Sequence, residues 1–140
     1  MRIFLDTNVL VAALATRGLC CELLEHVIHD HEFLTCTPVL AELERVLAGK
    51  LRLPAPAIAG FVALLRSEGR LVEPGRRPVI AIKDTGDVRI LACAISGKAD
   101  VFVTGDEELL ELRSVGNLPI VSPREIWLRL MGIDPPGKPA

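Results

Sequence analysis

The sequence predicts an α/β fold, a three-layer sandwich in which a central parallel sheet of about four to five strands lies between layers of helices. Short apolar runs alternate along the chain with segments of helical periodicity, which is the pattern of repeated strand–helix–strand units. The 140 residues suit a single domain, and half of them are apolar, enough for a buried core. We therefore expect one domain over residues 1–131 and a flexible tail, rich in proline and glycine, over residues 132–140.

The expected strands are short runs of apolar residues, and the expected helices show apolar residues at spacings of three and four. The predicted strands are 2–5, 33–36, 71–72, 100–104 and 118–121, with a stub at 79–80. The predicted helices are 8–15, 20–29, 38–49, 56–67, 86–95, 107–112 and 123–130. The helix over 86–95 is apolar almost all round, so we expect it to be central.

Polar residues at the expected helix starts support these boundaries. Thr7 or Asn8 is the expected N-cap of the first helix, and Thr37 that of the helix beginning at residue 38. Asp106 and Ser122 stand in the same position before the last two helices.

Composition excludes several classes of protein. A net charge of −2 and a pI near 5.9 exclude polybasic binding of nucleic acid. Aromatic residues make up 4% of the chain, too few for a base-stacking platform. None of the four cysteines forms a C-x-x-C pair, so a zinc knuckle is not expected. Neither a signal peptide nor an uncharged run of about 20 residues is visible, so we expect a cytoplasmic protein without a membrane segment.

Acidic residues follow the predicted strands at the sheet edge where α/β proteins bind ligands. Asp6 directly follows the first strand, and Asp106 follows the strand that ends at Thr104. Asp84 and Asp87 lie at the start of the apolar helix. Asp84, Asp87 and Asp106 could each be ordinary acids of a first helical turn, but an acid directly after a buried strand is harder to explain in that way.

A further acid comes from the helix after residue 37, but periodicity does not choose which one. Glu42 and Glu44 each lie about 100° from the centre of the apolar stripe, on opposite flanks. Converging carboxylates repel one another unless a cation neutralises them. Ligands that are all oxygen favour Mg²⁺ or Mn²⁺, and a pair of such ions promotes attack of water on a phosphodiester.

Four stretches resemble, in order, the motifs of the PIN domain family. These are FLDTNVLV around Asp6, PVLAEL around Glu42, DTGD ending at Asp87 and ADVFVTGDEELL around Asp106, followed by the closing LPIVSP. The resemblance runs from Arg2 to about residue 127, and it is closest to small VapC-like toxins of bacterial toxin–antitoxin pairs. Two details depart from the family pattern, since TG replaces the usual middle of the third motif and Glu108 stands where an aspartate is frequent.

The resemblance implies a PIN-like sandwich and a metal-dependent endoribonuclease that leaves 5′-phosphate and 3′-hydroxyl ends. It assigns catalysis and the binding of one or two Mg²⁺ or Mn²⁺ ions to four acids, and selects Glu42 over Glu44. The four are Asp6, Glu42, Asp87 and Asp106. The residues expected to support them are Asn8, Thr104, Asp84 and Glu108.

RNA is the substrate that the resemblance implies, and a cognate antitoxin is a further partner. Exposed apolar residues on the helices from Cys20 to Leu65 could serve a homodimer, which we also expect, or the antitoxin. An antitoxin arginine could enter the acidic crevice, since guanidinium pairs well with carboxylates. The pair Arg76 and Arg77, in a turn, is the best candidate for contact with substrate phosphates. Other candidates, for which an ordinary solvated side chain is the alternative, are Arg45, Lys50, Arg52 and Lys83.

Two alternative functions belong to other classes. The chain could be a catalytically silent PIN-fold module that recognises RNA or a protein partner, although the retained acids argue against it. A phosphatase with Asp6 as nucleophile would need an acid two residues later, where this chain has Asn8.

Overall fold

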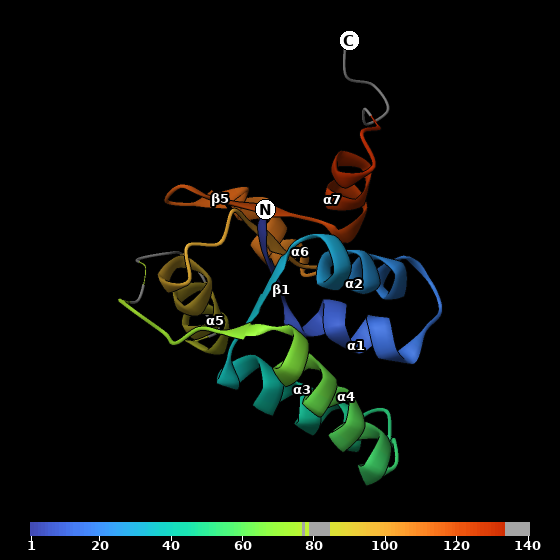
Figure 1. Ribbon diagram of the computed structural model, residues 1–140. Helices are drawn as coiled ribbons and strands as arrows, with labels where there is room; N and C mark the ends of the chain where they lie inside the picture. The colour runs from blue at the N-terminus through green and yellow to red at the C-terminus, as the bar shows by residue number, and fades with distance from the viewer. Residues whose placement is uncertain (77, 79–84, 134–140) are drawn as a thin grey trace.

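The computed structural model describes residues 1–76, 78 and 85–133, which form strands that alternate with helices (Figure 1). The strands are β1 (Arg2–Leu5), β2 (Glu32–Thr35), β3 (Arg70–Leu71), β4 (Val101–Val103), β5 (Ser114–Val115) and β6 (Leu118–Val121). The helices are α1 (Thr7–Ala15), α2 (Leu19–Asp30), α3 (Thr37–Gly49), α4 (Ala55–Glu68), α5 (Thr85–Ser96), α6 (Glu107–Leu112) and α7 (Pro123–Leu130). The predicted α/β class is confirmed. The stub at 79–80 and most of the predicted tail at 132–140 lie outside the described residues.

The described strands form one sheet in the order β3-β2-β1-β4-β6-β5. All neighbouring pairs are parallel except β5 and β6, which are antiparallel. The sheet is therefore mixed and has one strand more than expected. The extra strand β5 has only two residues, too few for a visible alternation, and it joins β6 through Gly116, whose φ of 58° suits a two-residue hairpin.

The strand order places a switch point between β1 and β4. From β1 the chain proceeds to β2 and β3 on one side, whereas β4 and β6 lie on the other side. Beyond the carboxyl ends of β1 and β4 the connections therefore diverge. This divergence leaves room for a ligand in α/β sheets.

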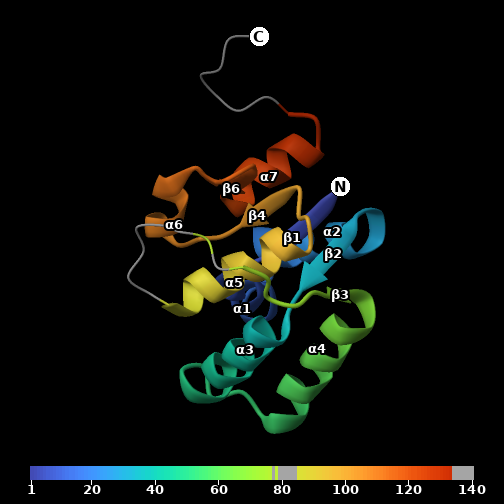
Figure 2. The same cartoon turned by 90° about the vertical axis from the view of Figure 1, so that its left-hand side faces the viewer.

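Helices cover both faces of the sheet. Figures 1 and 2 show α5 on one face and α1 with α2 on the other. The apolar residues of the central strands β1 and β4 are fully buried, and the rings of Phe4 and Phe102 on these strands stack with their centres 5.5 Å apart. In α5 the consecutive residues Ile90 to Ala94 are all buried, which is more than one full helical turn, so the middle of the helix is buried all round as expected. Arg89, Ile95 and Ser96 on either side of this turn are exposed.

Helix boundaries agree with the predicted ones within a residue or two, but two N-caps were predicted wrongly. Asp6, not Thr7 or Asn8, is the N-cap of α1, and its side chain accepts a hydrogen bond from the Thr7 N–H. Cys36, not Thr37, takes this position before α3. The caps of the last two helices are confirmed, Asp106 for α6 and Ser122, with a full capping box, for α7.

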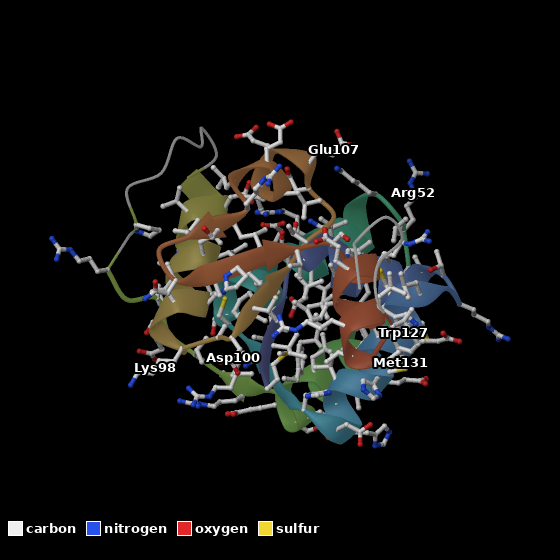
Figure 3. The ribbon with its side chains drawn as sticks, turned by 90° about the horizontal axis from the view of Figure 1, so that it is seen from above. Arg52, Lys98, Asp100, Glu107, Trp127 and Met131 are labelled. Atoms are coloured by element: carbon white, nitrogen blue, oxygen red, sulfur yellow. The ribbon has the colours of Figure 1, made fainter. Side chains whose placement is uncertain are left out.

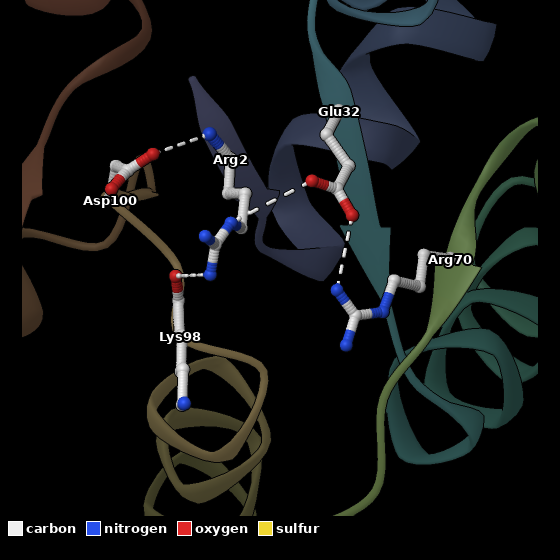
Figure 4. A network of polar contacts seen from close by, with 5 residues as sticks. All are labelled: Arg2, Glu32, Arg70, Lys98 and Asp100. Carbon is white, nitrogen blue, oxygen red and sulfur yellow. Dashed lines mark hydrogen bonds and ion pairs between the residues drawn. The ribbon is translucent and has the colours of Figure 1, made fainter.

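A polar network joins the amino ends of the strands (Figure 4). The Arg2 side chain contacts Glu32 at 3.7 Å, and Arg70 contacts the same carboxylate at 3.1 Å. The Arg2 backbone N–H donates to Asp100, and its guanidinium donates to the Lys98 carbonyl oxygen at 3.3 Å. These side chains are exposed, so each ion pair contributes below about 1 kcal/mol, and the network chiefly aligns the strand starts.

The two edges of the sheet therefore differ. Viewed from above, Lys98 and Asp100 lie at the amino edge, and Glu107, at the start of α6, lies at the opposite edge (Figure 3).

Among the described residues, no single helix is long and apolar enough to cross a membrane. Only α1 and α2 taken together, a pair bent by 110°, meet the criteria of length and composition.

Candidate functional site

Asp6 lies at the centre of the carboxyl edge. It follows β1 directly, caps α1, and its side chain is 4% exposed. Its Oδ1 accepts the Thr7 N–H at 2.8 Å, and its Oδ2 accepts the Thr104 hydroxyl at 2.8 Å and the Asn8 amide at 3.1 Å. Both carboxylate oxygens are therefore held in place by neutral donors.

Asn8 and Thr104 link Asp6 to the loop after β4. The Asn8 amide nitrogen also lies 3.2 Å from the Thr104 hydroxyl, and its carbonyl oxygen accepts the Gly105 N–H at 2.8 Å. The Thr104 oxygen in turn accepts the Asp106 N–H at 3.0 Å. Asp6 and Asp106, from neighbouring strands, are thus positioned by one shared network.

Burial and neighbouring charge raise the pKa of Asp6 from 3.8 to about 6. Burial is the largest cause, and the negative charges of Glu42 and Asp106 add to it. The hydrogen bonds from Thr104 and Thr7 oppose the rise in the pKa. Glu42 and Asp106 therefore lie near enough to repel the Asp6 carboxylate.

The structure distinguishes Glu42 from Glu44. Glu42 is half-buried on α3 and acts electrostatically on Asp6. Glu44 is exposed and lines a separate groove between α3 and α4. The alternative that periodicity left open is therefore resolved in space, with Glu42 on the side of Asp6.

The remaining predicted acids differ in their placement. Asp87 lies half-buried in the first turn of α5, a helix that contacts α3. Asp106 is half-buried and caps α6, since its Oδ1 accepts the N–H of Glu108 at 2.9 Å. Glu108 has an exposed side chain in the first turn of α6. Asp84 lies outside the described residues.

Arg76, the described member of the pair predicted to contact phosphate, does not lie near the acids. Gly75, which precedes Arg76, packs against Ser96 at the last residue of α5, and Asp87 lies at the opposite end of that helix. Arg76 is exposed there. Arg77 lies outside the described residues.

The donor set has the chemistry of a site for a hard divalent cation. Asp6, Glu42 and Asp106 offer only oxygen atoms, and none of them takes part in an ion pair within the described residues. The Thr7 hydroxyl beside Asp6 is buried without a hydrogen-bond partner in the described part of the chain. Among the same residues, no three carboxylates, histidines or cysteines are already arranged around one point as metal ligands. The acids would therefore have to turn toward a shared ion.

Two grooves flank the acids. One, of about 360 Å³, lies beside Asp106 and is lined by Asn8, Val9, Ala12, Cys20, Gly105 and Pro123. The other, of about 510 Å³, begins at Glu42 and continues between α3 and the start of α5. An extended substrate could enter through one groove and leave through the other.

Sequence reasoning missed the contributions of Thr7 and Gly105. Their backbone N–H groups hold Asp6 and Asn8, and a backbone donor leaves no trace in a residue pattern. The available signal was positional, because a residue that both ends a strand and starts a helix has free N–H groups next to it.

Comparison with known proteins agrees with the fold. The model of the PIN domain family matches residues 2–108. No curated protein matches the sequence.

Three solved structures have a similar fold. They are VapBC2 from Rickettsia felis bound to a DNA fragment from their promoter, VapBC-1 from nontypeable Haemophilus influenzae, and PAE2754 from Pyrobaculum aerophilum. Their TM-scores are 0.62, 0.61 and 0.67, and their sequence identities are 18%, 16% and 17%. The matches cover 87%, 89% and 94% of this chain, and 98%, 99% and 90% of the other chains. At such identities the similarity concerns the fold, and it is the family model, matching most of the chain, that shows this protein to belong to the PIN domain family.

Proposed function

We propose that this protein is a metal-dependent endoribonuclease that hydrolyses phosphodiester bonds of RNA. The observation that carries the proposal is the buried Asp6 carboxylate at the switch point, repelled by Glu42 and Asp106 and not neutralised by an ion pair within the described residues. Such an arrangement costs stability, so it needs a functional reason. Membership of the PIN domain family supports a nuclease as that reason.

Four acids would hold one or two Mg²⁺ or Mn²⁺ ions. They are Asp6, Glu42, Asp87 and Asp106. Bound divalent ions would neutralise these carboxylates, polarise the phosphate and make water a better nucleophile. Asn8 and Thr104 would keep Asp6 oriented by the hydrogen bonds that they already donate.

The reaction is in-line hydrolysis. A water oxygen forms a bond to phosphorus while the bond from phosphorus to the 3′ oxygen breaks, and Glu42 orients the attacking water. The water loses a proton, the departing 3′ oxygen gains one, and the products carry a 5′-phosphate and a 3′-hydroxyl. Asp6 remains ionised, since a protonated carboxyl is a poor ligand for a cation.

Cleavage of a mixed RNA pool tests the proposal. Wild type should cleave RNA in the presence of Mn²⁺ or Mg²⁺ and should show no cleavage in EDTA. Asp6→Asn should show no cleavage under any of these conditions. Glu42→Gln and Glu44→Gln are a matched pair on one helix. The first should lose activity, and the second, with its exposed side chain, should keep it.

The competing function is a silent PIN-fold module, and it predicts a different result. Folded wild type would then bind RNA or protein without cutting RNA under any metal condition. A crystal soak in Mn²⁺ would show no density at the acids in that case. Equal activity of Asp6→Asn and wild type would also exclude the proposed site.

The biological role that fits this nuclease is the toxin of a toxin–antitoxin pair. Two of the similar structures, VapBC2 and VapBC-1, are VapBC proteins, which supports an antitoxin as partner. We place an antitoxin arginine between Asp6 and Asp106, where its charge would meet two carboxylates. Expression of wild type should arrest growth of the host cell, whereas expression of Asp6→Asn should not.

We also propose that the protein forms a homodimer. Light scattering of the purified protein would test this.

A further inference from the structure

We propose that the groove between α3 and the start of α5 is the track for the RNA backbone on one side of the cleaved bond, with Arg45 and Lys50 each contacting a phosphate. This inference rests on the proposed nuclease function. It names two positioning residues and a binding surface beyond the four acids. The ligand chemistry is a single-stranded RNA with its phosphodiester groups.

The groove is built on one face of α3. Glu42, Arg45, Val46 and Gly49 recur at spacings of three, one and three, which places them in line along the helix. Lys50 closes the line as the C-cap residue of α3. Gly86, from the first turn of α5, forms part of the opposite wall of this space of about 510 Å³.

The groove is continuous with the candidate site. Glu42 lines its inner end and also acts electrostatically on Asp6. An RNA strand that lies in the groove would therefore reach the acids at the inner end of the groove. The grooved face also belongs to the carboxyl edge of the sheet, because α3 and α5 both begin there (Figure 2).

The charge of the groove suits phosphate. Arg45 and Lys50 are exposed, and neither takes part in an ion pair within the described residues. Glu42 is the single acid that lines the groove in this part of the chain, so its described lining carries a net positive charge.

The two cations leave α3 in different directions along the groove. Lys50 follows Arg45 by five positions, which is about 7.5 Å along the helix axis and about 140° around it. Each side chain can therefore contact its own phosphate. Gly49, between them, has open space where a Cβ would stand, so the backbone of a ligand can approach the helix closely.

Salt dependence of RNA binding tests the track without any need for cleavage. The probe is a fluorescein-labelled RNA of mixed sequence and 12 nucleotides. This length is chosen so that the RNA spans about three helical turns of α3 and extends beyond both ends. Its anisotropy is measured in EDTA over a range of KCl concentrations. Each of Arg45→Gln and Lys50→Gln should make the slope of log K against log[KCl] shallower by about 0.7, and the double variant by about twice that.

Arg66→Gln and Arg129→Gln are the matched controls. Both arginines are exposed, on α4 and α7, and neither lines the groove or forms an ion pair within the described residues. They change net charge by the same amount, so they should leave the slope near that of wild type. If the groove variants change the slope no more than these controls, the proposed track is wrong.

The outcomes separate this inference from the proposed function. Cleavage by wild type together with unchanged slopes would overturn the track and leave the nuclease intact. A shallower salt dependence of RNA binding in the groove variants, without cleavage of RNA by wild type, would support the track and contradict the nuclease. Where both hold, the double variant should lower kcat/KM while the rise in Tm on adding Mn²⁺ stays as in wild type, because the ion site is untouched.

Discussion

The hydroxyl of Thr104 lies 2.8 Å from Oδ2 of Asp6 and donates to it across 98 positions of sequence. The same oxygen accepts the Asp106 N–H at 3.0 Å. Thr104 follows β4, and Asp6 follows the neighbouring strand β1. One buried hydroxyl therefore holds the acids of two strands in a common geometry.

Thr104→Val should raise the pKa of Asp6 further, because the hydrogen bond from Thr104 is the largest of the effects that lower it. The acidic limb of the pH profile of kcat/KM should then move to higher pH. Thr104→Ser keeps a hydroxyl and should keep the limb near its wild-type position. If the valine and serine variants have the same profile, the hydroxyl does not control the ionisation of Asp6.

Asp6→Asn should remove a pH-dependent loss of stability from the metal-free protein. Below pH 3.8 the carboxyl is protonated in both the folded and the unfolded state, so its burial costs little. Between pH 3.8 and about 6 the unfolded state releases this proton while the folded state keeps it, so the cost grows over this range to about 3 kcal/mol for a pKa raised by about two units, and it stays there at higher pH. The asparagine variant avoids this loss.

Urea unfolding in EDTA at pH 4 and pH 7 measures this effect. The free energy of unfolding of the variant relative to wild type should be higher at pH 7 than at pH 4, because the cost of the Asp6 charge in wild type is nearly absent at pH 4. Glu44→Gln, which removes an exposed acid of α3, is the control and should show little change. A difference in free energy of unfolding between variant and wild type that is independent of pH would mean that ionisation of Asp6 does not destabilise the folded state.

Gly97→Ala and Gly60→Ala should have opposite effects on stability. A Cβ on Gly97 would lie 2.6 Å from Cγ1 of Val72, so the buried contact between the end of α5 and the segment after β3 would have to open. We expect a loss of about 1–3 kcal/mol. Gly60, inside α4, has open space at this position, and alanine there should stabilise by about 0.5–1 kcal/mol. Thermal unfolding of both variants checks the pair.

A bulky adduct on Cys20 should block RNA cleavage without unfolding the protein. Cys20 is half-buried and lines the groove beside Asp106, whereas Cys36 and Cys93 are fully buried. Burial raises the pKa of the Cys20 thiol, so labelling by a maleimide should be faster at pH 9 than at pH 7. The assay uses a Cys21→Ser background, so that Cys20 is the accessible thiol.

The control for this adduct is the same protein with Cys20→Ser as well. It should remain active after treatment, and mass spectrometry should find it unlabelled. Full activity of the singly labelled protein would show that the substrate does not use the groove beside Asp106.

Much of the fold could be predicted because its signals are local. The strand over residues 2–5 and the helices α1 to α7 follow from apolar periodicity and from turn residues, which act within a few positions. The same reasoning failed where the signal was too short or depended on hydrogen bonds. The strand β5 has two residues, and the cap of α1 is Asp6, the residue that directly follows β1.

The sequence by itself determined the class of fold, the order of its elements and the acids that punctuate them, since apolar patterning and capping are encoded residue by residue. Only the tertiary structure decided that Asp6 and Asp106 share one network, because the strand order that makes β1 and β4 neighbours comes from long-range pairing. It also placed Glu42 rather than Glu44 beside Asp6, since two residues on opposite flanks of one helix stripe differ only in what packs against each flank. The charge on Asp6 became costly in the same step, because burial, unlike sequence, sets the free energy of an ionised carboxylate.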